Sequence, residues 1–216
     1  NNVAIGYQAM QEETTGGNNT VVGHSAMDDS LAGLGNNNNT FIGFSSGGGT
    51  WDTAASLSNT AVGSNTMGGA MNGATYNVAM GHNALTALTT GDSNTAIGAS
   101  ALAAAGVGES YNIAIGQNAM ANADEGSEGG TATIDHNIAI GYNSLLLADL
   151  TNNSDTISKN IAIGGYALED TAGNAQTGAI AIGYQALKEL TSGTGNTAVG
   201  YTAGSLTVPD VSSFKA

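Results

Sequence analysis

The chain contains no cysteine and no arginine, and it has a single proline, Pro209. Without cysteine, neither a disulfide framework nor a thiolate metal site can form. Three lysines stand against 17 acidic residues, and the formal net charge is −14. Because phosphate binding needs clustered basic side chains, this balance argues against nucleic acid and against an anionic membrane surface as partners.

Large side chains and long apolar segments are also scarce. Aromatic residues make up 5% of the 216 residues and charged residues 9%, whereas glycine alone accounts for 33 positions. Such a chain cannot fill a thick globular interior, so we expect a thin, close-packed core. No apolar segment approaches the roughly 20 residues of a membrane span, and no signal peptide is visible, so membrane insertion is not expected.

The abundant feature is a repeated motif, first seen as Asn2-Val3-Ala4-Ile5-Gly6. Eleven copies end on a glycine, at intervals of 17 residues (Gly6 to Gly23) to 25 residues (Gly116 to Gly141). The repeat glycines are Gly6, Gly23, Gly43, Gly63, Gly81, Gly98, Gly116, Gly141, Gly164, Gly183 and Gly200. A period in this range is typical of stacked units in a solenoid.

Asparagine stands four residues before the glycine in ten copies, and Ala179 is the exception. The asparagines are Asn2, Asn19, Asn39, Asn59, Asn77, Asn94, Asn112, Asn137, Asn160 and Asn196. Stacked at one level, they can bond to one another and to backbone groups that a turn leaves unpaired, so we interpret them as a structural ladder. The glycines indicate a positive φ or a close approach between coils.

Each motif is short, β-branched and alternating, which predicts a strand that ends at the glycine. Side chains alternate along a strand, so Val3 and Ile5 share one face while Asn2 and Ala4 share the other. Both faces are therefore candidates for burial. The column of β-branched residues at the first position of each strand mixes Thr with Val and Ile, which disfavours ice binding, because that would need an unbroken threonine face.

The second half of each unit carries a small residue followed by Leu or Met, as in Ala84-Leu85. We favour a second short strand buried on both sides; one helical turn is the alternative, because Leu88 adds an apolar residue at helical spacing. In the third copy Phe41 replaces the usual Ala and Gly47 replaces the usual Leu or Met, a swap that conserves core volume.

We predict one repeat array over residues 1–204, followed by an irregular tail or the start of a further segment at 205–216. A terminal coil would expose an unpaired edge, so a cap, a partner or more chain is expected beyond it. Between the units lie polar connections, which belong on the surface. The two longest, residues 121–136 and 146–159, are candidate recognition loops, with solvated acidic loops as the alternative.

No catalytic motif appears: His24, His82 and His136 lie in separate repeats, and no triad, phosphate loop or zinc signature is present. We therefore expect no enzyme and no cofactor. Acidic pairs such as Asp28-Asp29 leave weak surface calcium binding open, although none follows a calcium-loop motif.

Rings follow the repeat glycine in seven copies, at Tyr7, His24, Phe44, His82, Tyr142, Tyr184 and Tyr201. They could bind sugars through their faces, or they could stack on each other as part of the wall. Trp51 and Phe44 form either an aromatic patch or a repacked rung. The candidate ligand surface comprises Phe44, Trp51, Asp124, Glu125, Glu128, Tyr142, Tyr184 and Tyr201.

The segments Asn94-Thr95-Ala96-Ile97-Gly98, Ala84-Leu85 and Thr89-Thr90-Gly91 resemble the head repeats of trimeric autotransporter adhesins. They resemble even more closely the repeats of phage tail fibres and of bacterial surface proteins built in the same way. The resemblance implies a left-handed parallel β-roll of about eleven coils, in which three chains pack side by side into a rod. The longer and irregular period of this chain departs from the adhesin heads.

The expected function is that of a phage tail-fibre-like protein, which attaches to a host-surface glycan through many contacts. Its partners would be two further copies of the chain, with further fibre segments end to end. The location would be a virion tail fibre, the extracellular space or a cell surface. The alternative is a secreted bacterial surface adhesin or an extracellular filament subunit.

Overall fold

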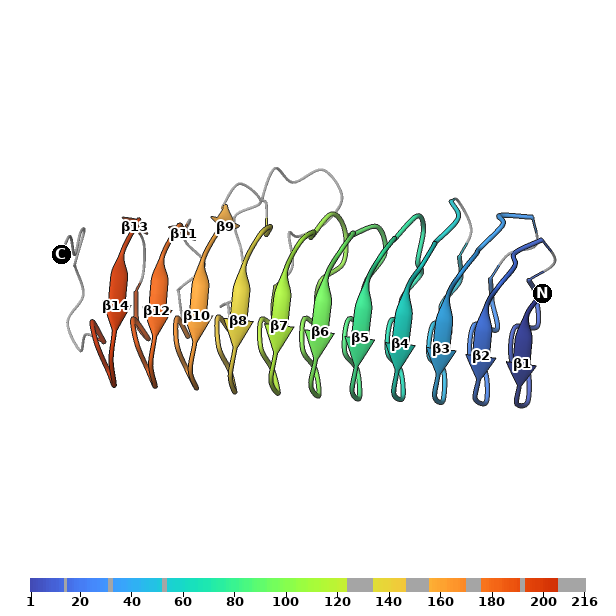
Figure 1. Ribbon diagram of the computed structural model, residues 1–216, viewed down its shortest axis with the longest axis horizontal. Helices are drawn as coiled ribbons and strands as arrows, with labels where there is room; N and C mark the ends of the chain where they lie inside the picture. Colours follow the sequence, from blue (N-terminus) through green and yellow to red (C-terminus); the bar gives the residue numbers. More distant parts are fainter. Residues whose placement is uncertain are drawn as a thin grey trace.

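The computed structural model describes residues 1–13, 15–30, 33–51, 54–123, 134–146, 156–169, 176–190 and 193–205. Over these ranges the chain is all-β and contains no helix, so none that could cross a membrane. One strand from each repeat joins a single parallel sheet, and the rungs succeed one another along a rod (Figure 1). The predicted parallel β-solenoid is confirmed.

The main sheet has eleven strands of three residues each, in sequence order. They are β1 (Val3–Ile5), β2 (Thr20–Val22), β3 (Thr40–Ile42), β4 (Thr60–Val62), β5 (Val78–Met80), β6 (Thr95–Ile97), β7 (Ile113–Ile115), β8 (Ile138–Ile140), β10 (Ile161–Ile163), β12 (Ile180–Ile182) and β14 (Thr197–Val199). Every pairing joins equivalent repeat positions, for example Val3 with Thr20 and Ile5 with Val22. At about 4.8 Å per strand, the sheet is about 48 Å long.

A second parallel sheet is formed by three short strands from the C-terminal part of the chain. It comprises β9 (Ile157–Ser158), β11 (Gln176–Thr177) and β13 (Gly193–Thr194). Two residues separate each of these strands from the main strand that follows it. Sequence reasoning does not find this sheet, because its two-residue strands lie in connections whose composition varies from coil to coil.

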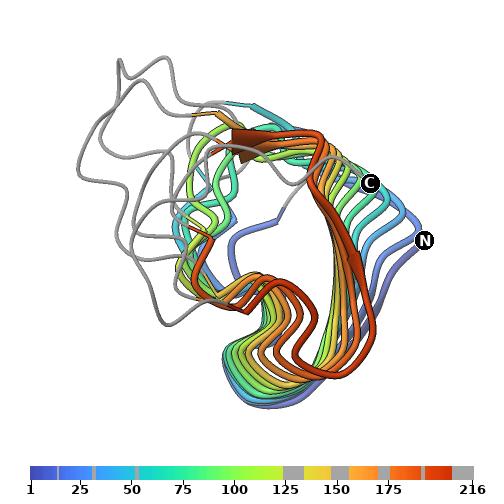
Figure 2. The ribbon, with the colours of Figure 1, turned by 90° about the vertical axis from the view of Figure 1, so that its left-hand side faces the viewer.

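The winding of the solenoid is left-handed. The strands run downward in Figure 1 and turn back at the lower edge. In Figure 2 the C-terminal end faces the viewer, and the chain descends along the strands on the right before returning on the left. The path is therefore clockwise as the chain advances toward the viewer, which is the left-handed sense that the resemblance implies.

The core is thin and is built from the middle residues of the strands and from the return segments that face them. Ala61, Ala79 and Ala96 are fully buried there, and Leu85 and Leu102 from the return segments pack against the same cluster. Alanine leaves room for these longer side chains across a narrow interior. A core this thin has little room for aromatic side chains, which agrees with their small number in the sequence.

The asparagines form a buried hydrogen-bonded ladder beside this core. The Oδ1 atom of Asn59 accepts bonds from the backbone N–H of Asn77 at 2.9 Å and from its Nδ2 at 3.1 Å. The Nδ2 atom of Asn77 in turn donates to the carbonyl of Gly91 at 2.8 Å. Each amide thereby satisfies backbone groups of the next coil that strand pairing does not reach. At Ala179 only the backbone N–H takes part, donating to Asn160 Oδ1 at 2.8 Å.

The second half of each repeat is neither a strand nor a helical turn, so the favoured prediction of a second strand is wrong. The residues two and four positions after every repeat glycine have φ between 46° and 64°. Hydrogen bonds still join the coils there, as from Ser25 N–H to Tyr7 O at 2.9 Å and from Met10 N–H to Ala26 O at 2.9 Å. Non-glycine residues rarely adopt this conformation, so a pattern of small and apolar residues does not reveal it.

The third coil is repacked in the way that its sequence indicates. A Cβ atom on Gly47 would lie 2.7 Å from the ring of Phe41. Trp51 is fully buried and meets Phe41 edge-on, with ring centroids 5.5 Å apart. The large ring of Phe41 thus occupies the space that Leu or Met fills in other coils.

Candidate functional site

The outer face of the main sheet carries a continuous, mainly apolar surface without charged side chains. Because only the middle residue of each strand points inward, the first and third residues of all eleven strands point outward. Nine of the Val, Ile and Met side chains on this surface are exposed, from 36% at Ile140 to 66% at Val199, and the other eight are partly buried. No charged residue occurs at these positions. We call this surface the outer sheet face.

The outer sheet face consists of two columns that run the length of the rod. The first column is Val3, Thr20, Thr40, Thr60, Val78, Thr95, Ile113, Ile138, Ile161, Ile180 and Thr197. The second column is Ile5, Val22, Ile42, Val62, Met80, Ile97, Ile115, Ile140, Ile163, Ile182 and Val199. Large contiguous exposed apolar surfaces are typical of interaction sites.

Aromatic rings follow the C-terminal ends of the strands in two separate groups. In the first, His24 lies between Tyr7 and Phe44, with ring centroids 5.1 Å and 5.4 Å apart. In the central coils His82 occupies this position between Ser64 and Ala99, and Gln117 follows, so the two groups are separated. We call Tyr7, His24 and Phe44 the N-terminal ring row.

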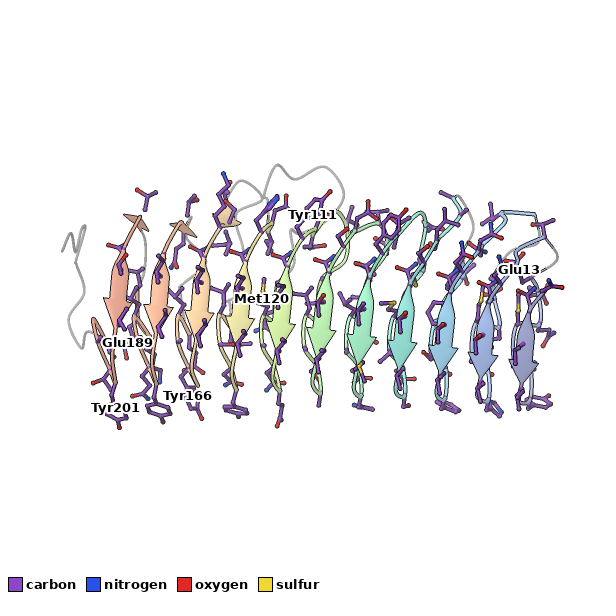
Figure 3. All side chains as sticks on the ribbon, viewed as in Figure 1. Glu13, Tyr111, Met120, Tyr166, Glu189 and Tyr201 are labelled. Atoms are coloured by element: carbon purple, nitrogen blue, oxygen red, sulfur yellow. The ribbon has the colours of Figure 1, made fainter. Side chains whose placement is uncertain are left out.

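The second group, which we call the tyrosine row, comprises Tyr142, Tyr166, Tyr184 and Tyr201. Successive ring centroids are 5.2 Å, 5.6 Å and 5.4 Å apart. Figure 3 shows Tyr166 and Tyr201 along the lower edge of the rod. Tyr166 was missed from the sequence, because Gly165 stands at the ring position and the tyrosine comes one residue later. The Gly-Gly-Tyr segment at 164–166 is the signal that could have found it.

Polar side chains are held beside the tyrosine row. Asn143 Nδ2 donates to Glu169 Oε1 at 3.0 Å, and Lys188 Nζ lies 3.3 Å from Glu169 Oε2. Lys188 Nζ is also 5.4 Å from the ring centroid of Tyr166, which is a cation–π distance. Partial burial raises the pKa of Tyr166 above its ordinary value of 10.0; Tyr142, Tyr184 and Glu169 add to the increase, whereas Lys188 opposes it.

A further set of rings precedes the ladder asparagines at the opposite end of the strands. Tyr76, Tyr111 and His136 occupy this position, each with φ of +60°. The rings of Tyr111 and His136 stack at 4.9 Å, and Tyr111 lies near the upper edge of the rod (Figure 3). Sequence reasoning did not single out this set, although a ring directly before each asparagine is visible at Tyr76-Asn77 and Tyr111-Asn112.

The remaining candidate ligand residues have different positions. Trp51 is fully buried, so it belongs to the repacked rung and not to a ligand surface, which corrects its assignment. Phe44 is exposed and joins the N-terminal ring row. Asp124, Glu125 and Glu128, like most of the two long loops, lie outside the described residues.

Acidic and polar side chains from the first coils surround an open hollow of about 270 Å³. Its lining includes Glu12, Asp28 and Asp29. Within the described ranges, no three His, Asp or Glu side chains come close enough together to hold a metal ion. Weak calcium binding stays a prediction.

Comparisons of the chain with family models, with curated proteins and with solved structures give no match. The outer sheet face and the ring rows are therefore the features of the chain that bear on its function.

Proposed function

We propose that this chain is a segment of a trimeric, phage tail-fibre-like rod that attaches to host-surface glycans through many weak contacts. The observation that carries the proposal is the outer sheet face, where eleven strands expose two columns of Val, Ile, Met and Thr without a charge. A single coil interior buries one face of the sheet. A second set of chains is needed to bury the other.

The size of the effect supports association. Removing the exposed part of an Ile or Val side chain from water is worth about 1 kcal/mol. The outer sheet face repeats this gain along eleven strands, so the sum is large enough to offset an association cost of roughly 4–15 kcal/mol. Cyclic symmetry lets all chains run in the same direction along a common rod axis, as a fibre requires.

Glycan attachment is supported by the exposed rings that line the rod outside this interface. Three chains present a glycan-binding ring row three times, so that low affinity at one row becomes high avidity on a surface that carries many copies of the glycan. The net charge of −14 favours an uncharged ligand over a polyanionic one.

A pair of charge variants tests the assembly. Ile97→Glu places a carboxylate on the outer sheet face, and we expect it to convert the trimer into monomers, because several kcal/mol are needed to bury an unpaired charge. Gln117→Glu adds the same charge at an exposed position after a repeat glycine and should leave the trimer intact. Equal masses for both variants in light scattering would contradict the proposed interface.

The same rod would suit a secreted bacterial surface adhesin or an extracellular filament subunit. The segments that adjoin this chain in its gene distinguish the two. A virion-attachment or chaperone domain supports the tail fibre, whereas a signal peptide with a membrane anchor supports the adhesin.

A further inference from the structure

We infer that the tyrosine row and the polar side chains beside it form the glycan-contacting site of the rod. The inference rests on the proposed function and names the part of the surface that performs it. The site residues, which share four successive coils, are Tyr142, Asn143, Tyr166, Glu169, Tyr184, Lys188 and Tyr201.

The orientation of Tyr166 distinguishes this row from a simple stack of wall residues. Tyr184 and Tyr201 are nearly parallel, with an interplanar angle of 14°, so each covers a face of the other. Tyr166 lies at 77° to Tyr142 and at 83° to Tyr184. Tyr166 therefore interrupts a parallel stack, and Lys188 Nζ lies over its ring at 5.4 Å from the centroid. The neighbouring rings of Tyr142 and Tyr184 are exposed and offer ring surface beside this cation. A ring face of this kind is what the apolar face of a pyranose packs against.

The polar side chains beside the row supply hydrogen-bond donors and acceptors for the hydroxyl groups of the same sugar. Each hydroxyl both donates and accepts hydrogen bonds. The ammonium group of Lys188 is a donor, the carboxylate of Glu169 is an acceptor, and Asn143 offers an amide that can do both. Their mutual contacts at 3.0 Å and 3.3 Å hold Glu169 between the other two. Because these side chains are already ordered, less conformational entropy is lost when a ligand binds.

Charge indicates the class of glycan. Lys188 and Glu169 neutralise each other within the site, and the chain as a whole is strongly acidic. Repulsion would weaken the binding of a polyanionic polysaccharide. The expected ligand is therefore a neutral oligosaccharide with vicinal hydroxyls.

The N-terminal ring row provides a matched control inside the same molecule. Tyr7, His24 and Phe44 have similar ring spacings to the tyrosine row. The charged residues that line the hollow in these coils are the acids Glu12, Asp28 and Asp29. Removal of a ring from the N-terminal ring row reduces the exposed aromatic area of the rod but leaves the residues of the proposed site unchanged.

The experiment uses the intact 216-residue chain and begins with an array of neutral and acidic oligosaccharides. The best neutral binder is then titrated against the unchanged chain and against Tyr166→Ala, Tyr184→Ala, Tyr184→Phe and Tyr7→Ala. We expect Tyr166→Ala and Tyr184→Ala to weaken binding about tenfold or more, as truncation of a central aromatic contact does. Tyr184→Phe, which keeps the ring, and Tyr7→Ala should stay within about twofold of the unchanged chain. Thermal unfolding and mass are measured for each variant, so that a folding defect is recognised.

Different outcomes separate this site from the general function. If the unchanged chain binds a neutral glycan and well-folded Tyr166→Ala and Tyr184→Ala bind it equally well, the site is wrong while glycan attachment stands. If only acidic glycans bind, the ligand class is wrong. If the unchanged chain binds no glycan at all, both the proposed function and this site are overturned.

Discussion

A Cβ atom on Gly98 would lie 2.6 Å from the carbonyl carbon of Gly116 in the next coil. The same residue has φ of +134°. Both reasons for a repeat glycine, the backbone conformation and the close approach between coils, therefore act at one position.

These two reasons can be separated by experiment. Gly98→Ala would suffer from both the strained backbone conformation and the collision with the next coil. Gly200→Ala would suffer from the backbone conformation alone, because Gly200 has φ of +136° but a Cβ there would lie 3.7 Å from its nearest neighbour, Ala203. We expect Gly200→Ala to cost about 1–3 kcal/mol through backbone strain and Gly98→Ala to cost clearly more. Denaturant unfolding of both variants measures the difference. Equal costs would show that the contact between coils is unimportant.

The exchange of large and small residues in the third coil predicts a compensating pair. Gly47→Leu alone should destabilise the protein, because its side chain would collide with Phe41. Phe41→Ala alone should leave a cavity and cost about 3–5 kcal/mol. The double variant restores the arrangement of other coils, where Leu85 has φ of +49° opposite an alanine, so it should be more stable than the sum of the single changes implies. Strict additivity in thermal or denaturant unfolding would rule out the direct exchange.

The pKa of Tyr166 predicts a change at alkaline pH. Because its pKa in the folded state is raised above 10.0, the folded protein favours the protonated phenol. That stabilisation is complete below pH 10 and is lost as the pH rises through the raised value. An ultraviolet titration should therefore contain a phenolate component that forms above the ordinary tyrosine value. Tyr166→Phe should remove this component and Tyr201→Phe should not; persistence of the component in Tyr166→Phe would contradict the assignment.

The sequence predicts the rod well because its strongest signals are local and repeated. Asn2 and Gly6 mark the two ends of a strand, and the alternation between them places Ala4 and Ile5 on opposite faces of the sheet; which of the two faces is the interior is visible only in the structure. The motif recurs eleven times, so the pairing register between neighbouring strands follows from aligning its copies.

What could not be predicted depends on conformations that the residue types disfavour. Met10 and Leu85 adopt positive φ although a side chain is rarely found there; hydrogen bonds to neighbouring coils hold them. Tyr166 joins the tyrosine row from one position beyond the expected one, which only the three-dimensional turn reveals. The sequence allows Trp51 to belong to an aromatic patch or to a repacked rung, and only its buried contact with Phe41 decides for the rung.

The mass of the assembled protein tests the central claim most directly. Light scattering coupled to gel filtration, repeated by sedimentation equilibrium over a range of concentrations, should give three times the chain mass of 21.2 kDa, which is 63.6 kDa. A folded species that remains at 21.2 kDa at all concentrations would contradict the account, because the outer sheet face would then be stable in water without a partner.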